Sequence, residues 1–215
     1  MSLNPNCWGS KIFINMKNKM FLLGAMLLVS GYACAQMVED FSSNQLGWTE
    51  ISSKRGKAGI ANGVLHLETR APGHVVTSTC YAPFDFNKPF VLTCDALAKK
   101  VDDDRVFGIL LDYEDDNNYI LFYMCEGEAR LERYVEGRLA AKKFELLKLQ
   151  SGRRVGIEFE VDYNLTELVF KVNGIKSMSY RRRLAKGEYM LGTSGIGFLA
   201  RDGQVIDFDN LKIVQ

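Results

Sequence analysis

Residues 105–134, RVFGILLDYEDDNNYILFYMCEGEARLERY, limit the fold of this chain more than any other stretch. Two segments rich in Phe, Ile, Leu and Tyr, which suit a pleated and half-buried sheet, flank residues 114–117, where Asp and Asn favour a turn. If those four residues form the loop, Tyr113 faces Asn118. Because side chains alternate across a strand, one face is then fully apolar. The predicted core face consists of Phe107, Ile109, Leu111, Ile120, Phe122 and Met124.

The second face of this stretch mixes aromatic and polar side chains. A further turn at Glu126 and Gly127 adds a third strand and sets Leu131 opposite Phe122 on the core side. The second face then holds Leu110, Asp112, Tyr119, Leu121, Tyr123, Arg130, Glu132 and Tyr134, with Asp112 opposite Tyr119. The same register turns Arg133 toward the core. Either its guanidinium reaches water from near a sheet edge, or the register slips by one residue, which would exchange the two faces.

The chain from residue 36 onward continues in short alternating segments separated by turn signals. Asn173 and Gly174, for example, form a strong hairpin turn signal, and no convincing amphipathic helix is present. About a dozen short strands at regular spacing predict an all-β fold of antiparallel sheets, as in a sandwich or a barrel. No linker interrupts residues 36–215, so we expect a single domain there.

The charges of the chain nearly cancel, with a formal net charge of +1. A chain with this balance offers no strongly basic surface for nucleic acid or for an anionic membrane. Nucleic acid is therefore not an expected partner. The one dense basic run, at residues 181–183, is typical of a solvated loop or strand end.

Residues 16–35, MKNKMFLLGAMLLVSGYACA, have the pattern of a secretory signal peptide. Lys17 and Lys19 precede an apolar core, and Ala33-Cys34-Ala35 is a small-residue cleavage site. The apolar run is too short for a comfortable transmembrane helix, so we expect an exported, periplasmic or extracellular protein without a membrane span. Lipidation at Cys34 is the less expected alternative. Residues 1–15 fit no export pattern and suggest a mis-assigned start.

Three cysteines, Cys80, Cys94 and Cys125, follow the predicted cleavage site. An oxidising compartment permits a disulfide. Cys80 and Cys94 are the expected pair because they lie on successive predicted strands. The alternative is that all three are small buried hydrophobic residues.

Residues 36–215 contain a set of motifs in this order: DF…GW, GVLHL, FDFNKPFVLTCDA, FGILLDYEDDNNYILFYM, LERYVEG, KVNG and GIGFLARDGQVIDFDNLKI. This set of motifs resembles the concanavalin A-like lectin/glucanase superfamily. In particular, the chain is similar to exported bacterial domains of the laminin-G-like and 3-keto-disaccharide-hydrolase types. The resemblance implies a two-sheet antiparallel jelly roll with a carbohydrate ligand on its concave sheet. It does not fix the activity, because this fold carries lectins, hydrolases, lyases and adhesion modules.

The second face of residues 105–134 is the candidate binding site for such a ligand. Sugars stack their apolar faces on aromatic rings, and charged side chains bind their hydroxyl groups. The candidate ligand-binding residues are Asp112, Tyr119, Tyr123, Arg130, Glu132 and Tyr134. The alternative for Arg130 and Glu132 is that they are ordinary solvated charges on a half-exposed sheet.

The evidence for catalysis in the sequence is weaker. Glucanases of this fold carry a Glu-x-Asp-x-x-Glu pattern, and the nearest stretch, EFEVD at residues 158–162, lacks that spacing. The retaining mechanism needs two carboxyl groups about 5–5.5 Å apart. Glu158 and Glu160 share one face of a strand. The simpler interpretation of this pattern is the solvent-exposed face of an amphipathic strand. The catalytic candidates are Glu132, Glu158 and Glu160, and we expect a non-catalytic protein.

Two acidic runs are weak candidates for calcium, which takes six to eight oxygen ligands. Their residues are Asp102, Asp104, Asp115 and Asp116. Turn capping is the alternative for all four, and no other cofactor is expected. Three functions stay open: an exported carbohydrate-binding domain at the cell envelope, a glycoside hydrolase of the 3-keto-disaccharide-hydrolase type, and an adhesion module with a protein partner.

Overall fold

The computed structural model describes residues 36–161, 166–181 and 191–215, with the backbone alone at residues 159–161. These residues contain strands and no helix, and no segment among them forms a helix able to cross a membrane. They belong to one compact unit, residues 35–215. The expected signal peptide and start extension lie outside the described residues.

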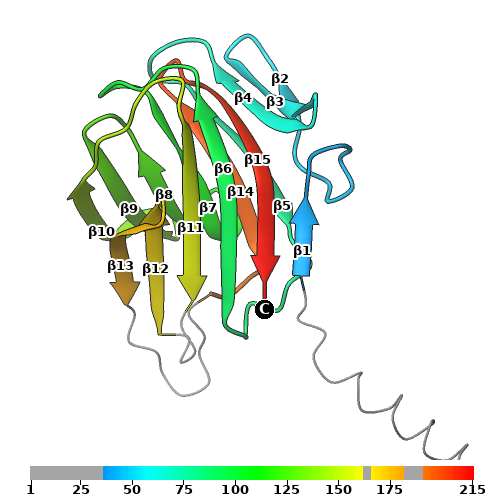
Figure 1. Cartoon of the computed structure of the whole chain (residues 1–215), viewed down its shortest axis with the longest axis vertical. Coiled ribbons are helices and arrows are strands. Elements are labelled where there is room, and N and C mark those ends of the chain that lie inside the picture. Colours follow the sequence, from blue (N-terminus) through cyan, green and yellow to red (C-terminus); the bar gives the residue numbers. More distant parts are fainter. Residues whose placement is uncertain (1–35, 162–165, 182–190) are drawn as a thin grey trace, which may run out of the picture. The chain divides into compact units, whose positions relative to one another are not determined.

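Two antiparallel sheets form a sandwich, as predicted. The nine-stranded sheet contains, in order, β13 (Ile175–Arg181), β12 (Glu167–Val172), β11 (Arg154–Val161), β6 (Phe90–Ala98), β15 (Val205–Val214), β4 (Val64–Thr69), β3 (Gly56–Ala61) and β2 (Ile51–Ser52), with β1 (Gln36–Glu39) beside β15. The six-stranded sheet contains, in order, β10 (Arg138–Leu146), β9 (Glu128–Val135), β8 (Asn118–Met124), β7 (Val106–Asp115), β14 (Gly195–Arg201) and β5 (Val75–Tyr81). Figure 1 looks onto the nine-stranded sheet, with β11, β6 and β15 side by side in front.

Aromatic rings from both sheets meet in the core between them. The rings of Phe122 and Phe170 stack with centroids 4.6 Å apart, and those of Phe198 and Phe208 with centroids 4.2 Å apart. Each pair joins a strand of one sheet to a strand of the other. The whole predicted core face of residues 105–134 is buried here, which confirms that assignment.

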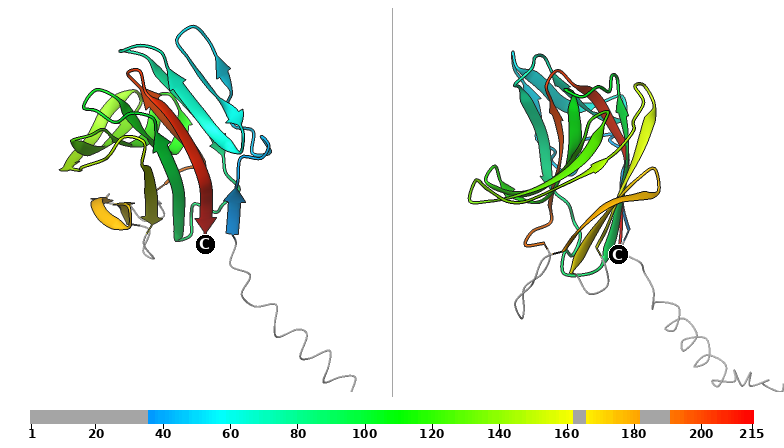
Figure 2. Two further views of the ribbon diagram at one scale, coloured as in Figure 1. Left: turned by 45° about the horizontal axis from the view of Figure 1, so that its top comes forward. Right: turned by 90° about the vertical axis from the view of Figure 1, so that its left-hand side faces the viewer.

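The register of the three central strands is confirmed for most pairs. Leu131 lies opposite Phe122, and Gly108 lies opposite Tyr123. Arg133 is half-buried opposite Ile120, on the strand next to the edge strand β10, so the register does not slip. Figure 2 shows the strong curvature of these strands, drawn in green.

The prediction that residues 114–117 form the loop is wrong. Pairing runs regularly to Leu111 and resumes with Asp115 opposite Asn118, so Tyr113 does not face Asn118 and Asp112 does not face Tyr119. Asp112 adopts a φ of 52°. Its Oδ1 accepts hydrogen bonds from the backbone N–H groups of Gly192 and Thr193, at 2.6 and 3.1 Å. The irregularity in β7 thus bends the strand to hold the segment that leads into β14.

The expected disulfide does not form, because Cys80 and Cys94 are both free, buried thiols. Cys80 lies on β5 at the edge of the six-stranded sheet, and Cys94 lies on β6 in the interior of the other sheet. The prediction assumed that successive strands are neighbours, whereas the chain crosses between sheets here. Burial, together with the nearby Glu39, raises the pKa of the Cys80 thiol to about 12, so this thiol is unreactive at neutral pH.

Candidate functional site

The outer face of the six-stranded sheet brings together five of the six predicted ligand-binding residues. Tyr119 lies opposite Tyr134, Tyr123 lies opposite Arg130, and Glu132 lies opposite Leu121. These pairs agree with the register expected from the sequence. Because Phe122 and Leu131 point into the core, their neighbours along each strand point outward. We call this surface the tyrosine face, defined by Tyr119, Tyr123, Arg130, Glu132, Tyr134, Lys142 and Phe144.

The Glu132 carboxylate is the polar centre of the tyrosine face. The hydroxyl of Tyr123 donates to its Oε1 at 2.9 Å, and the hydroxyl of Tyr134 donates to its Oε2 at 3.0 Å. The Lys142 ammonium lies 3.6 Å from Oε1. Glu132 as a whole is 9% exposed. A nearly buried carboxylate needs such partners, because leaving it unpaired costs several kcal/mol.

Both tyrosines stay protonated at neutral pH and so remain donors to Glu132. Burial and the hydrogen bond to Glu132 raise the pKa of Tyr134 to about 12. The same two causes raise the pKa of Tyr123. Burial, followed by the charge of Glu132, also raises the pKa of Tyr119. The hydroxyl groups therefore serve to fix the carboxylate, and no tyrosinate nucleophile is available near pH 7.

An apolar layer lies beneath these polar groups. Its buried members are Val106, Leu110, Leu121, Tyr123, Cys125 and Leu199. The Arg201 guanidinium lies 5.5 Å from the centroid of the Tyr123 ring, in cation–π range. The rings of Tyr119 and Tyr134 are only half-buried, with centroids 4.9 Å apart. The accessible aromatic surface therefore consists of the Tyr119 and Tyr134 rings. They lie beside the apolar layer, whose own residues are buried.

Two residues of the tyrosine face were not predicted from the sequence. The β9–β10 pairing shifts by one residue between Leu139 and Ala141, and this bulge sets Phe144 opposite Arg130 and Lys142 opposite Glu132. Phe144 is 64% exposed. A two-residue turn without the bulge would have placed Phe144 opposite Ala129, on the core face. The sequence signals the turn at residues 136–137 but gives no signal for the bulge.

Asp112, the sixth predicted ligand-binding residue, does not join the tyrosine face. Its carboxylate is occupied by the backbone of Gly192 and Thr193, as described above. The prediction placed it opposite Tyr119, and the irregularity in β7 removes that pairing. Asp112 is therefore a structural residue of the β7–β14 connection.

The catalytic candidates are divided between the two sheets. Glu132 lies on the outer face of the six-stranded sheet, and Glu158 lies on the outer face of the nine-stranded sheet. The Lys171 ammonium is 2.6 Å from Glu158 Oε1. Only the backbone of Glu160 is described. Glu132 and Glu158 thus cannot act on one bond as a carboxyl pair.

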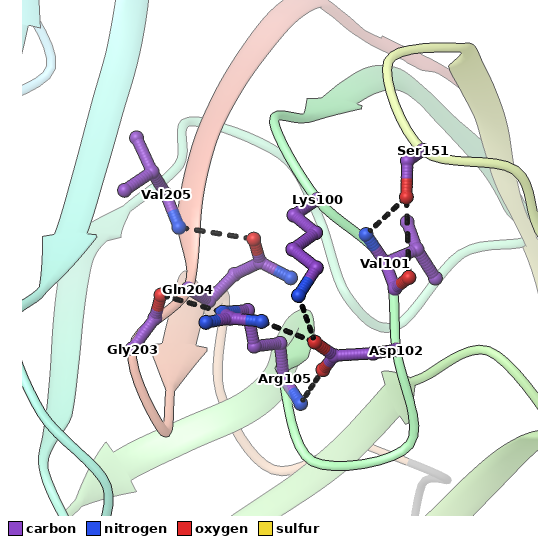
Figure 3. Close-up of polar contacts among 8 residues, drawn as sticks. All are labelled: Lys100, Val101, Asp102, Arg105, Ser151, Gly203, Gln204 and Val205. Atoms are coloured by element: carbon purple, nitrogen blue, oxygen red, sulfur yellow. Dashed lines mark hydrogen bonds and ion pairs between the residues drawn. The ribbon is translucent and has the colours of Figure 1, made fainter.

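Asp102, the first calcium candidate, is engaged in ion pairs in the loop that precedes β7 (Figure 3). Asp102 forms ion pairs with Arg105 and with Lys100, whose Nζ lies 3.2 Å from Oδ2. Arg105 Nε donates to the backbone oxygen of Gly203 at 3.1 Å, which ties two loops together. Two cations on one carboxylate leave little affinity for a third.

The remaining calcium candidates have equally local roles where the structure gives them partners. Asp115 Oδ1 accepts from Asn117 N at 2.7 Å, and Asp116 Oδ1 accepts from Tyr113 OH at 3.0 Å. Asp104 is exposed. Within residues 36–161, 166–181 and 191–215, no three His, Cys, Asp or Glu side chains are grouped as metal ligands. Calcium binding by these four residues stays a prediction.

Comparison with known proteins identifies the fold. No protein-family model and no curated sequence matches the chain. A Bacillus subtilis protein with a galectin-like fold is similar, with a TM-score of 0.60, 12% identity and coverage of 86% of this chain and 96% of that one. A Bacillus licheniformis β-glucanase is also similar, with a TM-score of 0.59, 11% identity and coverage of 86% and 99%.

A third similar structure is a sialidase, with a TM-score of 0.61 and 14% identity. The match covers 83% of this chain but only 18% of the sialidase. Likenesses at such low identity concern architecture alone, since this fold serves many functions. The chain has the galectin-like, concanavalin A-like β-sandwich fold that the sequence motifs resemble.

Proposed function

We propose that this protein binds carbohydrate on the tyrosine face and does not cleave it. The observation that carries the proposal is the half-buried Tyr119–Tyr134 ring pair next to a carboxylate whose two oxygens are already held in place. Aromatic rings stack on the apolar faces of sugars. A fixed carboxylate and an ammonium group bind hydroxyl groups through charge-assisted hydrogen bonds. Pre-organisation of Glu132 lowers the cost of ordering the site on binding.

Two further observations favour this ligand. Phe144 offers a second, more exposed ring on the neighbouring strand, opposite Arg130. The proteins of similar fold include a β-glucanase and a sialidase. Because their sequence identity to this chain is low, they support a shared fold and say nothing about the binding site.

Binding is favoured over cleavage because of the surroundings of the carboxyl groups. Retaining hydrolysis needs a nucleophile and an acid about 5–5.5 Å apart, one of which must donate a proton. On the tyrosine face Glu132 accepts hydrogen bonds from two hydroxyls and pairs with Lys142. The next acidic residue along β9, Glu128, forms an ion pair with Arg130. Neither group is placed to release a proton to a leaving group.

A glycan array tests the proposal directly. The purified protein should be retained by one glycan class without releasing products, in calcium and in EDTA alike. Tyr134→Ala and Phe144→Ala should each lower the affinity at least tenfold. Val38→Ala is the matched control, because Val38 is 60% exposed on β1, which pairs with β15 in the other sheet. Product release would indicate an enzyme. An equal loss of glycan affinity in the control variant would contradict the proposed binding site.

A protein partner is the second candidate function, supported by exposed apolar side chains on the edge strand β10. Leu139, Phe144 and Leu146 are 50%, 64% and 88% exposed. Exposed apolar groups on an edge strand are typical of interaction surfaces. This candidate would be favoured if the protein bound no glycan on the array. It would also require concentration-dependent association of the protein with itself or with a partner protein, which Leu146→Ser should abolish.

We further propose that the protein acts outside the cytoplasm. The support is the signal-peptide pattern of residues 16–35. N-terminal sequencing of the protein recovered from expressing cells should find Gln36 as the first residue. An N-terminus that retains residues 16–35 in the cytoplasmic fraction would contradict export.

A further inference from the structure

A shallow pocket of about 350 Å³ lies on the outer face of the nine-stranded sheet, opposite the side of the sandwich that carries the tyrosine face. We call it the bulge pocket. Side chains and backbone from β6, β11 and β15 line it, including Thr93, Asp95, Gly156, Glu158, Asn210 and Lys212. These three strands lie side by side in Figure 1. Pockets of this size hold small ligands.

A β-bulge in β15 shapes the pocket. Asp209 pairs with Asp95 and Lys212 pairs with Thr93, so two residues of β15, Asn210 and Leu211, stand opposite one residue of β6. Leu211 is fully buried in the core. Asn210 adopts a left-handed φ of 53° and is exposed. Bulges redirect a side chain and are frequent beside functional sites.

Gly156 forms part of the pocket and has no structural reason to be glycine. It lies inside β11 and its φ is not in the left-handed region. A Cβ added there would find its nearest neighbour, Asn173 Oδ1, at 3.8 Å, which is ordinary contact. Glycine weakens a strand interior and often marks the close approach of a ligand. Its absent side chain here keeps the pocket open.

The carboxylates around the pocket are held by hydrogen bonds and ion pairs, whereas other polar groups there can bind a ligand. Asp95 Oδ2 accepts from Arg154 Nη1 at 2.9 Å and from Asn210 Nδ2 at 2.8 Å. Lys171 holds Glu158 Oε1 at 2.6 Å. In contrast, the Lys212 ammonium and the Thr93 hydroxyl have no hydrogen-bond or ion-pair partner in the part of the chain that the structure describes. The pocket therefore offers donors and oriented acceptors together.

The charges at the pocket favour a neutral ligand. Among the described residues, three carboxylates (Asp95, Glu158 and Asp209) and three cations (Arg154, Lys171 and Lys212) lie at the pocket, so their formal charges cancel. An anion would be repelled by three carboxylates, and a cation would compete with ion pairs already formed. Hydroxyl groups, which donate and accept, suit the mixture of Lys212, Thr93, Asp95 and Glu158.

We propose that the bulge pocket is a second binding site, for a neutral polyhydroxylated molecule of the size of one sugar ring. Among the described residues no aromatic side chain lines it, so it differs in chemistry from the tyrosine face and binds without ring stacking. A shallow site of hydrogen bonds alone is expected to bind with a Kd on the order of 1–10 mM. The proposal does not depend on binding at the tyrosine face.

Amide chemical shifts of the purified, ¹⁵N-labelled protein test the proposal. The probes are methyl β-D-glucopyranoside, methyl β-D-galactopyranoside and myo-inositol, with D-glucuronate as the charged comparison. At least one neutral probe should cause saturable shifts at Gly156, Gly174 and Asn210, whether or not Tyr134 shifts as well. Saturation with glucuronate alone, or with no neutral probe, would overturn the proposal.

Two variants with a matched control locate the site. Gly156→Val should abolish the saturable shifts while preserving or raising Tm, because a β-branched residue suits an open strand position. Lys212→Met should raise Kd at least threefold. Lys57→Met is the control on the same sheet, since Lys57 is exposed outside the pocket. An unchanged Kd in Gly156→Val would contradict the site. If that variant fails to fold, Lys212→Met alone decides.

Discussion

The outer faces of the two sheets treat their charged side chains in opposite ways. On the six-stranded sheet, Glu132 is 9% exposed and rests on an apolar layer. On the nine-stranded sheet, Asp95, Glu158 and Asp209 lie in ion pairs open to water. The first face presents rings beside a fixed carboxylate, and the second presents exposed ion pairs around the bulge pocket.

This difference shows that the surroundings of a charge decide what it contributes. A carboxylate that is nearly buried must be fully bonded, so its partners are held rigidly. An exposed ion pair contributes about 0–1 kcal/mol and leaves its members free to bind something else. The two faces should therefore respond differently to the same substitutions, and the following predictions start from the largest expected effect.

Removal of a single carboxylate should separate the faces most clearly. Glu132→Ala leaves two tyrosine hydroxyls and Lys142 without their acceptor, and should lower the free energy of unfolding by about 2–3 kcal/mol. Glu158→Ala removes one partly exposed ion pair with Lys171 and should cost less than about 1 kcal/mol. Urea unfolding of both variants measures the difference. Equal losses would contradict the contrast between a buried and an exposed carboxylate.

Removal of one hydroxyl should have a smaller effect of the same kind. Tyr123→Phe deletes the donor at 2.9 Å from Glu132 Oε1 and keeps the ring beneath Arg201. The expected loss is about 1 kcal/mol in the free energy of unfolding. Thr93→Val on the other face removes a hydroxyl that has no partner among the described residues, and should be close to neutral. A neutral Tyr123→Phe would mean that the hydroxyl does not support Glu132.

The sequence predicts this contrast only where the strands are regular. Alternation correctly gives the core face and the pairing of Leu131 with Phe122, because a buried face penalises any slip of register. It fails wherever an extra residue enters a strand. The irregularity at Asp112 involves Gly192 and Thr193, far along the chain, and the bulge before Ala141 has no signature in the local composition. The bulge turns Phe144 outward, and only the three-dimensional pairing reveals it.

The pH dependence of stability offers a subtler test of the tyrosine face. Burial and the bond to Glu132 raise the pKa of Tyr134 from 10 to about 12 in the folded protein. The folded state therefore favours the protonated form, a contribution present in full below pH 10 and lost as pH rises to about 12. Tyr134→Phe should flatten the decline in Tm between pH 10 and 12. Tyr81→Phe, at an exposed position on β5, is the control and should leave the decline unchanged.

The smallest expected effect concerns salt, and it tests the nine-stranded face. Arg154 joins Asp95 at 2.9 Å and Asp209 at 3.4 Å through one nitrogen, yet its side chain is 50% exposed. Arg154→Ala should therefore cost about 0.5 kcal/mol in low salt. The loss should disappear near 1 M salt, where the screening length is about 3 Å. The loss in Glu132→Ala should persist in the same salt, because it arises from unmet hydrogen bonds and burial. If salt abolished both losses, Glu132 would be an ordinary surface charge, and the pre-organised carboxylate on which the binding proposal rests would be lost.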